Sequence, residues 1–230
     1  MPPILSTAEM VRAANLEKGS WRPDWHRCRR HTLVPAFRAL LAYRAVQRVD
    51  EQHVPGDIVE AGVWHGGLSC LMARAHQRQQ RRRAVFNRTS WLMDTFSGMP
   101  APNRTLDGWK ADAMYERFRN GSTTGLGCRV EAGKWCFGSF EMVSKLMDGV
   151  AGARRTRYVR GKVEDTLLDE RELPRQIAVL RLDTDWYTST LAELDVLWPR
   201  LSPGGWLYID DYFDFAGCAG ERGPRVAAPM

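Results

Sequence analysis

The chain has 230 residues, 44% of them hydrophobic and 26% charged, which suits one domain with a full core and excludes a fibrous or disordered chain. Its net charge of +6 indicates an anionic partner or simply a soluble basic surface. No apolar run approaches the roughly 20 residues of a membrane span, and no signal-peptide pattern opens the chain. We therefore expect a cytoplasmic protein with no membrane association.

Residues 1–55 are predicted to form a helical N-terminal segment. Ser6 and Glu9 make a capping-box pattern at the start of one helix. Pro35 suits the first position of a second helix, whose apolar residues recur on one face. A turn at residues 53–56 ends this segment.

Five short apolar runs then follow, separated by segments of helix length. Near-continuous apolar runs of this kind are typical of a buried parallel sheet. The runs cover residues 57–63, 91–96, 157–159, 177–182 and 206–209. The sequence therefore predicts an α/β fold with a parallel sheet flanked by helices.

Three further helices are expected between the runs, whereas most of residues 97–155 carry no clear pattern. One helix is predicted at residues 68–79 and another at residues 140–150. The third begins at a capping box of Thr190 and Glu193 and ends at a turn formed by residues 202–205.

Two compositional features bear on partners and on redox state. The basic run at residues 78–83 has no interleaved aromatic residues, so a solvated loop after a helix is favoured over a nucleic-acid patch. The cysteines are odd in number and dispersed, which favours reduced thiols; they are Cys28, Cys70, Cys128, Cys136 and Cys218.

A glycine-rich stretch at residues 60–67 follows the first apolar run, where a parallel sheet binds ligands. Its glycines allow a tight turn and close approach of a ligand to the backbone, and the next helix offers its N-terminal amides. The spacing is not that of dinucleotide binders, and a purely structural turn explains the pattern equally well. His65 is interpreted as a packing residue rather than a base, and Trp64 and Trp186 as a pocket wall or core.

Acidic residues follow three of the other runs. Asp94 ends the second run, where an acid can accept both hydroxyls of a ribose. Asp183 and Asp185 follow the fourth run, and Asp210 and Asp211 follow the fifth. Facing clusters of like charge require a cation between them, and an all-carboxylate set suits Mg²⁺. The alternative is that these acids cap the next helices.

Taken together, these segments resemble the macrocin O-methyltransferases. The resemblance is carried by GDIVEAGVWHGGLSCLMARA, WLMDTFSGMP, VRGKVEDTL, IAVLRLDTDWYTSTLAELDVLWPRLSPGGW and YIDDY. It implies a Rossmann-like class I methyltransferase domain at residues 56–218 that binds S-adenosylmethionine. The cofactor-binding residues implied are Glu60, Gly62, Trp64, Gly66, Gly67, Asp94 and Ser97. Asp183, Asp210 and Asp211 would hold Mg²⁺, with Asp183 also the candidate general base.

The family pattern continues past the last acids into a helix and two strands, whereas residues 219–230 form a divergent tail. We therefore expect the C-terminal strands to be missing and residues 206–209 to form an exposed apolar edge, covered by a partner or a second copy. The predicted activity is Mg²⁺-dependent O-methylation of a small-molecule hydroxyl, such as that of a natural-product sugar. The alternative is a truncated, catalytically silent relative that acts as a cofactor-binding or interaction module.

Overall fold

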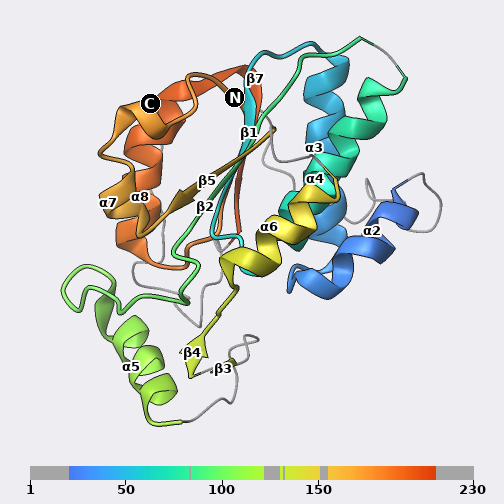
Figure 1. Ribbon diagram of the computed structural model, residues 1–230. Helices are drawn as coiled ribbons and strands as arrows, with labels where there is room; N and C mark the ends of the chain where they lie inside the picture. The colour runs from blue at the N-terminus through green and yellow to red at the C-terminus, as the bar shows by residue number, and fades with distance from the viewer. Residues whose placement is uncertain (1–20, 83, 122–129, 132, 151–154, 211–230) are drawn as a thin grey trace.

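Five parallel strands form the central sheet of the computed structural model, in the order β5–β2–β1–β6–β7 (Figure 1). The structure describes residues 21–82, 84–121, 130–131, 133–150 and 155–210. The strands are β1 (Asp57–Ala61), β2 (Ser90–Asp94), β5 (Thr156–Arg160), β6 (Ile177–Leu182) and β7 (Leu201–Ile209). Each predicted run overlaps one of them, although the first two runs were predicted to extend two residues beyond β1 and β2, and this confirms the α/β sheet.

The beginning of β7 differs from the prediction. Residues 202–205 were expected to form a turn, but they lie within the strand. The pairing of β6 with β7 shifts here, since Ile177 pairs with Leu201 and Val179 pairs with Trp206. The glycines and proline therefore form an irregularity inside the strand rather than a turn before it, because extra residues in one strand can be absorbed without ending the pairing.

Helices cover both faces of the sheet (Figure 1). On one face lie α2 (Arg22–Cys28), α3 (Ala36–Glu51), α4 (Gly67–Gln80) and α6 (Phe140–Asp148). On the other lie α7 (Val163–Thr166) and α8 (Tyr187–Leu197). Ile58 packs in the core of the first face and its neighbour Val59 in that of the second, as expected of a strand buried on both sides.

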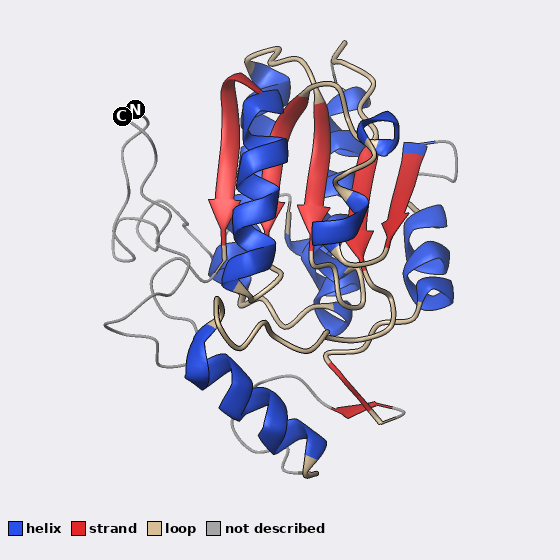
Figure 2. Cartoon of the chain, turned by 90° about the vertical axis from the view of Figure 1, so that its left-hand side faces the viewer, coloured by secondary structure: helices blue, strands red, loops and turns tan. Residues whose placement is uncertain are grey.

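A smaller layer lies beyond the carboxyl ends of the strands, toward which all the strand arrows of the sheet point (Figure 2). It contains α5 (Gly108–Arg119) and the antiparallel pair β3 (Val130–Glu131) and β4 (Lys134–Trp135). Trp135 and Met114 of this layer pack with Trp186 in a separate hydrophobic cluster. No periodic pattern in the sequence predicted these elements.

The helix predictions are confirmed at α4 and α6, and Pro35 is the N-cap residue of α3. The Ser6–Glu9 capping box lies outside the described residues. The basic run begins inside α4, where Arg78 donates hydrogen bonds of 3.0 and 2.8 Å to Asp24 Oδ2. The prediction of a solvated loop is therefore wrong for Arg78, which belongs to a structural ion pair.

The remaining expectations concern an exposed sheet edge and the absence of a membrane span. Among the described residues, β7 lies at the edge of the sheet and Trp206 is 42% exposed, as expected of an apolar edge. No helix in the described part of the chain is long and apolar enough to cross a membrane.

The cysteines only partly follow the expectation of reduced thiols. Cys28 and Cys70 are free and buried, with sulfur atoms 3.1 Å apart. Cys136 is disulfide-bonded, which corrects the prediction for this residue. Dispersion along the sequence does not determine which side chains the fold brings together.

The predicted capping box of Thr190 and Glu193 is wrong. Helix α8 begins at Tyr187, so Thr190 and Glu193 lie within the helix, and the amide of Thr190 bonds the carbonyl of Trp186. The carboxyl of Glu193 is fully buried and makes no well-aligned hydrogen bond among the described residues. Burial raises its pKa well above the ordinary value; Glu164 and Asp183 raise it further and Thr184 opposes the shift.

This burial makes stability depend on pH. A carboxyl whose pKa is higher in the folded state stabilises the fold fully below its unfolded pKa, and this contribution is lost as pH rises toward the folded pKa. We expect Glu193→Gln to gain stability relative to the wild type as pH rises from 4.5 to 7.5. Urea unfolding at several pH values measures this, with the exposed Glu172→Gln as control. A constant difference at all pH values would show that Glu193 does not keep its proton.

Candidate functional site

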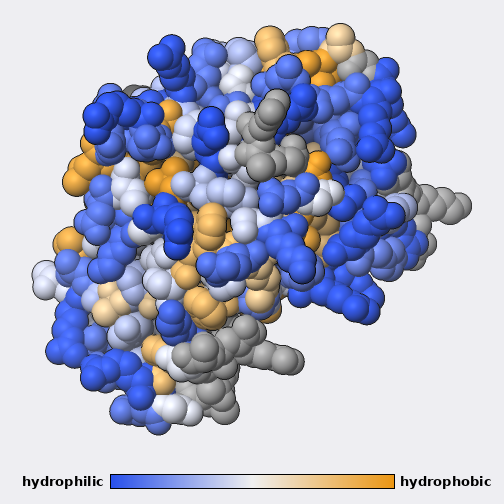
Figure 3. Space-filling model, in the orientation of Figure 1, coloured by the Kyte–Doolittle hydropathy of each residue, from blue (hydrophilic) through white to orange (hydrophobic). Residues whose placement is uncertain are grey.

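A cavity of about 390 Å³ opens at the carboxyl ends of the strands, within the size range of small-molecule sites. Its floor is formed by the ends of β1, β2, β6 and β7, and the segment that contains α5 and β4 contributes Met114 and Trp135 to one wall. Apolar side chains gather on the face between this segment and the main body, with mostly polar residues around them (Figure 3). The cavity is therefore amphipathic and lies where parallel sheets bind ligands.

The glycine loop follows β1 as predicted. Gly62 has φ +77°, and a Cβ there would collide with the carbonyl oxygen of Asp183 at the end of β6. Gly66 also has φ +77° and is the N-cap residue of α4, where a Cβ would come within 2.9 Å of Val143. Glycine is thus required at both positions, because the backbone is left-handed and the neighbours are close.

Trp64 and His65, in the same loop, have different surroundings. Trp64 lines the cavity, with its backbone at φ +48°. The ring of His65 stacks on Trp64 at a centroid distance of 3.7 Å, and its Nε2 lies 3.0 Å from the carbonyl oxygen of Phe137. Since His65 is buried and is not among the cavity-lining residues, these contacts support the packing interpretation.

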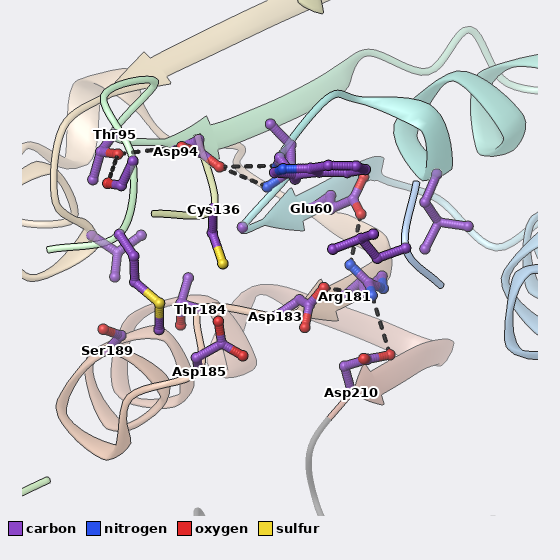
Figure 4. A pocket seen from close by; sticks show the side chains of 18 of the residues that line it. Glu60, Asp94, Thr95, Cys136, Arg181, Asp183, Thr184, Asp185, Ser189 and Asp210 are labelled. Atoms are coloured by element: carbon purple, nitrogen blue, oxygen red, sulfur yellow. Dashed lines mark hydrogen bonds and ion pairs between the residues drawn. The ribbon is translucent and has the colours of Figure 1, made fainter. Parts of the chain in front are cut away.

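Asp94 braces the glycine loop from the end of β2 (Figure 4). Its Oδ2 accepts hydrogen bonds from the amides of Val63 at 2.8 Å and Trp64 at 3.2 Å, and its Oδ1 accepts one from Phe96 at 2.8 Å. Burial raises the pKa of the carboxyl, and these amides oppose the shift. Thr95 Oγ1 lies 3.4 Å from Oδ1, but its one proton has a shorter acceptor in the carbonyl oxygen of Gly98 at 2.7 Å. Of the about four lone-pair sites of an ionised carboxylate, one is therefore left for a ligand hydroxyl.

Glu60 is held deeper in the protein. Ser69 of α4 donates a hydrogen bond to one carboxylate oxygen, and Arg181 Nη1 lies 2.7 Å from the other. Glu60 and Arg181 are direct neighbours in the pairing of β1 with β6, which fixes this contact. Burial raises the pKa of Glu60 and Arg181 opposes the shift. Glu60 therefore reaches the cavity as part of an ion pair.

Arg181 is the cation that the facing acids require. Its side chain is 1% exposed, and its Nη2 lies 2.7 Å from Asp183 Oδ2 and 3.1 Å from Asp210 Oδ1 (Figure 4). Burial alone would lower the pKa of the guanidinium, but Asp183, Glu60 and Asp210 together raise it above its ordinary value. Arg181 was not predicted as a site residue, although a lone arginine in a buried apolar run indicates an ion partner.

The predicted metal ligands are brought together only in part. Asp183 and Asp210 meet at one guanidinium nitrogen, whereas Asp211 lies outside the described residues. Asp210 Oδ1 is buried and makes no well-aligned hydrogen bond among the described residues, so it retains capacity as a hard oxygen donor. In the described part of the chain no three acidic, histidine or cysteine side chains are placed to hold a metal. Both described acids are already paired with Arg181, so the Mg²⁺ site stays a prediction.

Several other predicted and unpredicted residues surround this centre. Asp185 lines the cavity, Gly67 begins α4 behind the loop, and Ser97 is exposed and not among the lining residues. Arg38 of α3 was missed; its Nη1 lies 3.2 Å from Asp210 Oδ2. No sequence motif distinguishes it, because only the fold brings α3 to the end of β7.

Residues with a left-handed backbone conformation are also concentrated at the site. Among the described residues, four of the five non-glycine positions with positive φ lie in or next to the cavity lining. These are Trp64 at 48°, Phe96 at 50°, Cys136 at 49° and Asp185 at 67°. Non-glycine residues rarely adopt this conformation, and such strain clusters at functional sites. The distribution supports a ligand site at this end of the sheet.

Known proteins resemble the chain over most of its length. The profile of the macrocin-O-methyltransferase family matches residues 6–222. A demethyldecarbamoylnovobiocin O-methyltransferase of Streptomyces niveus is 32% identical over 202 residues, which are 85% of this chain and 67% of that protein. The 8-demethyl-8-(2,3-dimethoxy-alpha-L-rhamnosyl)-tetracenomycin-C 4'-O-methyltransferase of Streptomyces olivaceus is 37% identical over 186 residues, 79% of this chain and 62% of that protein.

The fold agrees with these matches. The solved structure of the O-methyltransferase NovP has a TM-score of 0.64 and 32% identity to this chain, and the match covers 82% of this chain and 70% of that one. The chain spans between 62% and 67% of the length of the two curated relatives. On the extent of the family match and the identity to these relatives, the chain belongs to the macrocin-O-methyltransferase family.

Proposed function

We propose that the protein transfers a methyl group from S-adenosylmethionine to a hydroxyl group of a small molecule, such as a sugar on a natural product. The observation that carries the proposal is the meeting, in one cavity, of the glycine loop, Asp94 and the acids Asp183 and Asp210. The names of two relatives support it, since both denote O-methyltransferases of natural products.

The charge of the cavity suits the cofactor. Its lining has six acidic and three basic side chains: Glu60, Asp94, Glu164, Asp183, Asp185, Asp210, Arg38, Lys162 and Arg181. S-adenosylmethionine carries a positively charged sulfonium and an ammonium group, so an excess of acids favours its binding. In this proposal Asp94 accepts the ribose hydroxyls, and the backbone of the glycine loop lies against the rest of the cofactor.

Asp183 is proposed as the base that accepts the proton of the acceptor hydroxyl. Its side chain lines the cavity, is 24% exposed and is oriented by Arg181. Asp183, Asp210 and Asp211 are proposed to hold Mg²⁺, which when bound lowers the pKa of a hydroxyl and orients it. The remaining work of the chain is to hold the methyl group and the oxygen in line and to exclude water.

Binding of the cofactor tests the first part of the proposal. Asp94→Ala removes the acceptor of the ribose hydroxyls and leaves the amides of Val63 and Trp64 unpaired. We expect at least tenfold weaker binding of S-adenosylmethionine in calorimetric titration, with Asp94→Asn intermediate. The exposed Asp195→Ala on α8 is the control. Wild-type affinity in folded Asp94→Ala would rule out this role.

Metal dependence tests the second part. Methyl transfer is measured as S-adenosylhomocysteine release with a panel of hydroxylated natural-product glycosides. We expect chelation by EDTA to abolish turnover and added Mg²⁺ to restore it, and Asp210→Asn to reduce it at least a hundredfold while cofactor binding persists. Turnover unaffected by EDTA would refute the metal role. Cofactor binding without turnover under any condition would instead support the silent relative.

A further inference from the structure

Two contacts fasten residues 99–119, which contain α5 and are called the α5 segment below, to the start of α8. The indole Nε1 of Trp186 donates a hydrogen bond of 3.0 Å to the carbonyl oxygen of Pro100. Asp107 Oδ1 accepts hydrogen bonds from the amide of Thr188 at 2.8 Å and from its hydroxyl at 2.9 Å. Both partners on the α8 side lie shortly after Asp183, the proposed base. One short stretch of chain therefore contains the proposed base Asp183 and also anchors the α5 segment.

The contact with Thr188 is an N-cap supplied from a distant part of the chain. The N-cap residue of α8 is Trp186, whose side chain does not cap the helix. Thr188 lies in the first turn, where amides have no partner inside the helix. The Asp107 carboxylate satisfies this amide from 81 residues away, and its negative charge is favourable at a helix N-terminus.

Asp107 caps the distant helix α8 and not its own helix α5. It is the N-cap residue of α5, where an aspartate commonly bonds the amides of its own helix, but its side chain makes no such bond. Its Oδ2 accepts the amide of Asn103, which closes the turn before α5. The residue is 9% exposed, so both oxygens are directed into protein contacts.

The fastened segment forms part of the cavity wall. Met99, Pro100 and Met114 line this side, and Trp135 packs against Trp186 with ring centroids 6.1 Å apart. The hydrogen bonds of Asp107 go to Asn103 and Thr188, and none of those described reaches the glycine loop or Asp94. The position of α5 therefore bears on the wall formed by Met114 and Trp135 without a direct contact to the proposed cofactor loop.

We infer that Asp107 is a positioning residue, which clamps the α5 segment onto the N-terminus of α8 and so sets the geometry of the acceptor side of the cavity. The kinetic part of this inference rests on the proposed methyl transfer. The structural part, that one carboxylate couples α5 to the chain that follows Asp183, does not depend on turnover.

Hydrogen exchange monitored by mass spectrometry tests the clamp without any substrate. In Asp107→Ala, we expect exchange at least tenfold faster in peptides covering residues 100–119 and at the start of α8, with β1 and β2 unchanged. Asp107→Asn retains a carbonyl acceptor for Thr188 and should restore most of the protection. Asp112→Ala is the control, because this acid lies on the same helix and its described partner is the exposed Arg104.

Kinetics and cofactor binding test the consequence of the Asp107 clamp for the cavity. We expect Asp107→Ala to raise the KM for the acceptor at least tenfold, while the Kd for S-adenosylmethionine stays within twofold and Asp107→Asn recovers the KM. Unchanged exchange in α5, or faster exchange throughout the sheet, would overturn the clamp. A wild-type protein without turnover would refute the proposed function, and the exchange result would then decide the clamp by itself.

Discussion

The arrangement of the site depends on one buried cation. The Arg181 guanidinium contacts Glu60 of β1, Asp183 after β6 and Asp210 after β7, so it joins the ends of three adjacent strands. Without it, three carboxylates would face one another in a partly dry environment, where like charges and unpaired ions are costly. The acids of the cavity are therefore tolerated because a cation from the sheet itself balances them. A ligand that enters this cavity meets carboxylates whose charge Arg181 already balances in part.

The sequence was sufficient to predict the elements that obey local rules. The five strands and helices α4 and α6 follow from apolar runs and periodicity, and the glycine loop and acids follow from their place after the runs. The role of Arg181 required the pairing of β1 with β6, which joins residues 121 positions apart. Helix α5 buries only Ala111 and Met114 and gave no clear pattern. The capping box at Thr190 and Glu193 failed because the same residue types also occur inside a helix.

The two sides of the cavity are built differently. The side proposed to bind the cofactor consists of strand ends and the loop braced by Asp94, which belong to the main sheet and its cores. The side proposed to bind the acceptor is a small layer with its own hydrophobic cluster. Segments with few buried contacts vary and move more readily than the core. The two relatives of this chain are named for different acceptors.

The left-handed residues around the cavity have a consequence for evolution and engineering. Trp64, Phe96, Cys136 and Asp185 each hold a backbone conformation that costs on the order of 1–3 kcal/mol in a non-glycine residue. Glycine would relieve this strain but would also remove a side chain from the site and loosen the loop. Selection for thermostability and selection for turnover therefore act in opposite directions at these positions. A stabilised variant is best sought elsewhere in the chain, with these residues left unchanged.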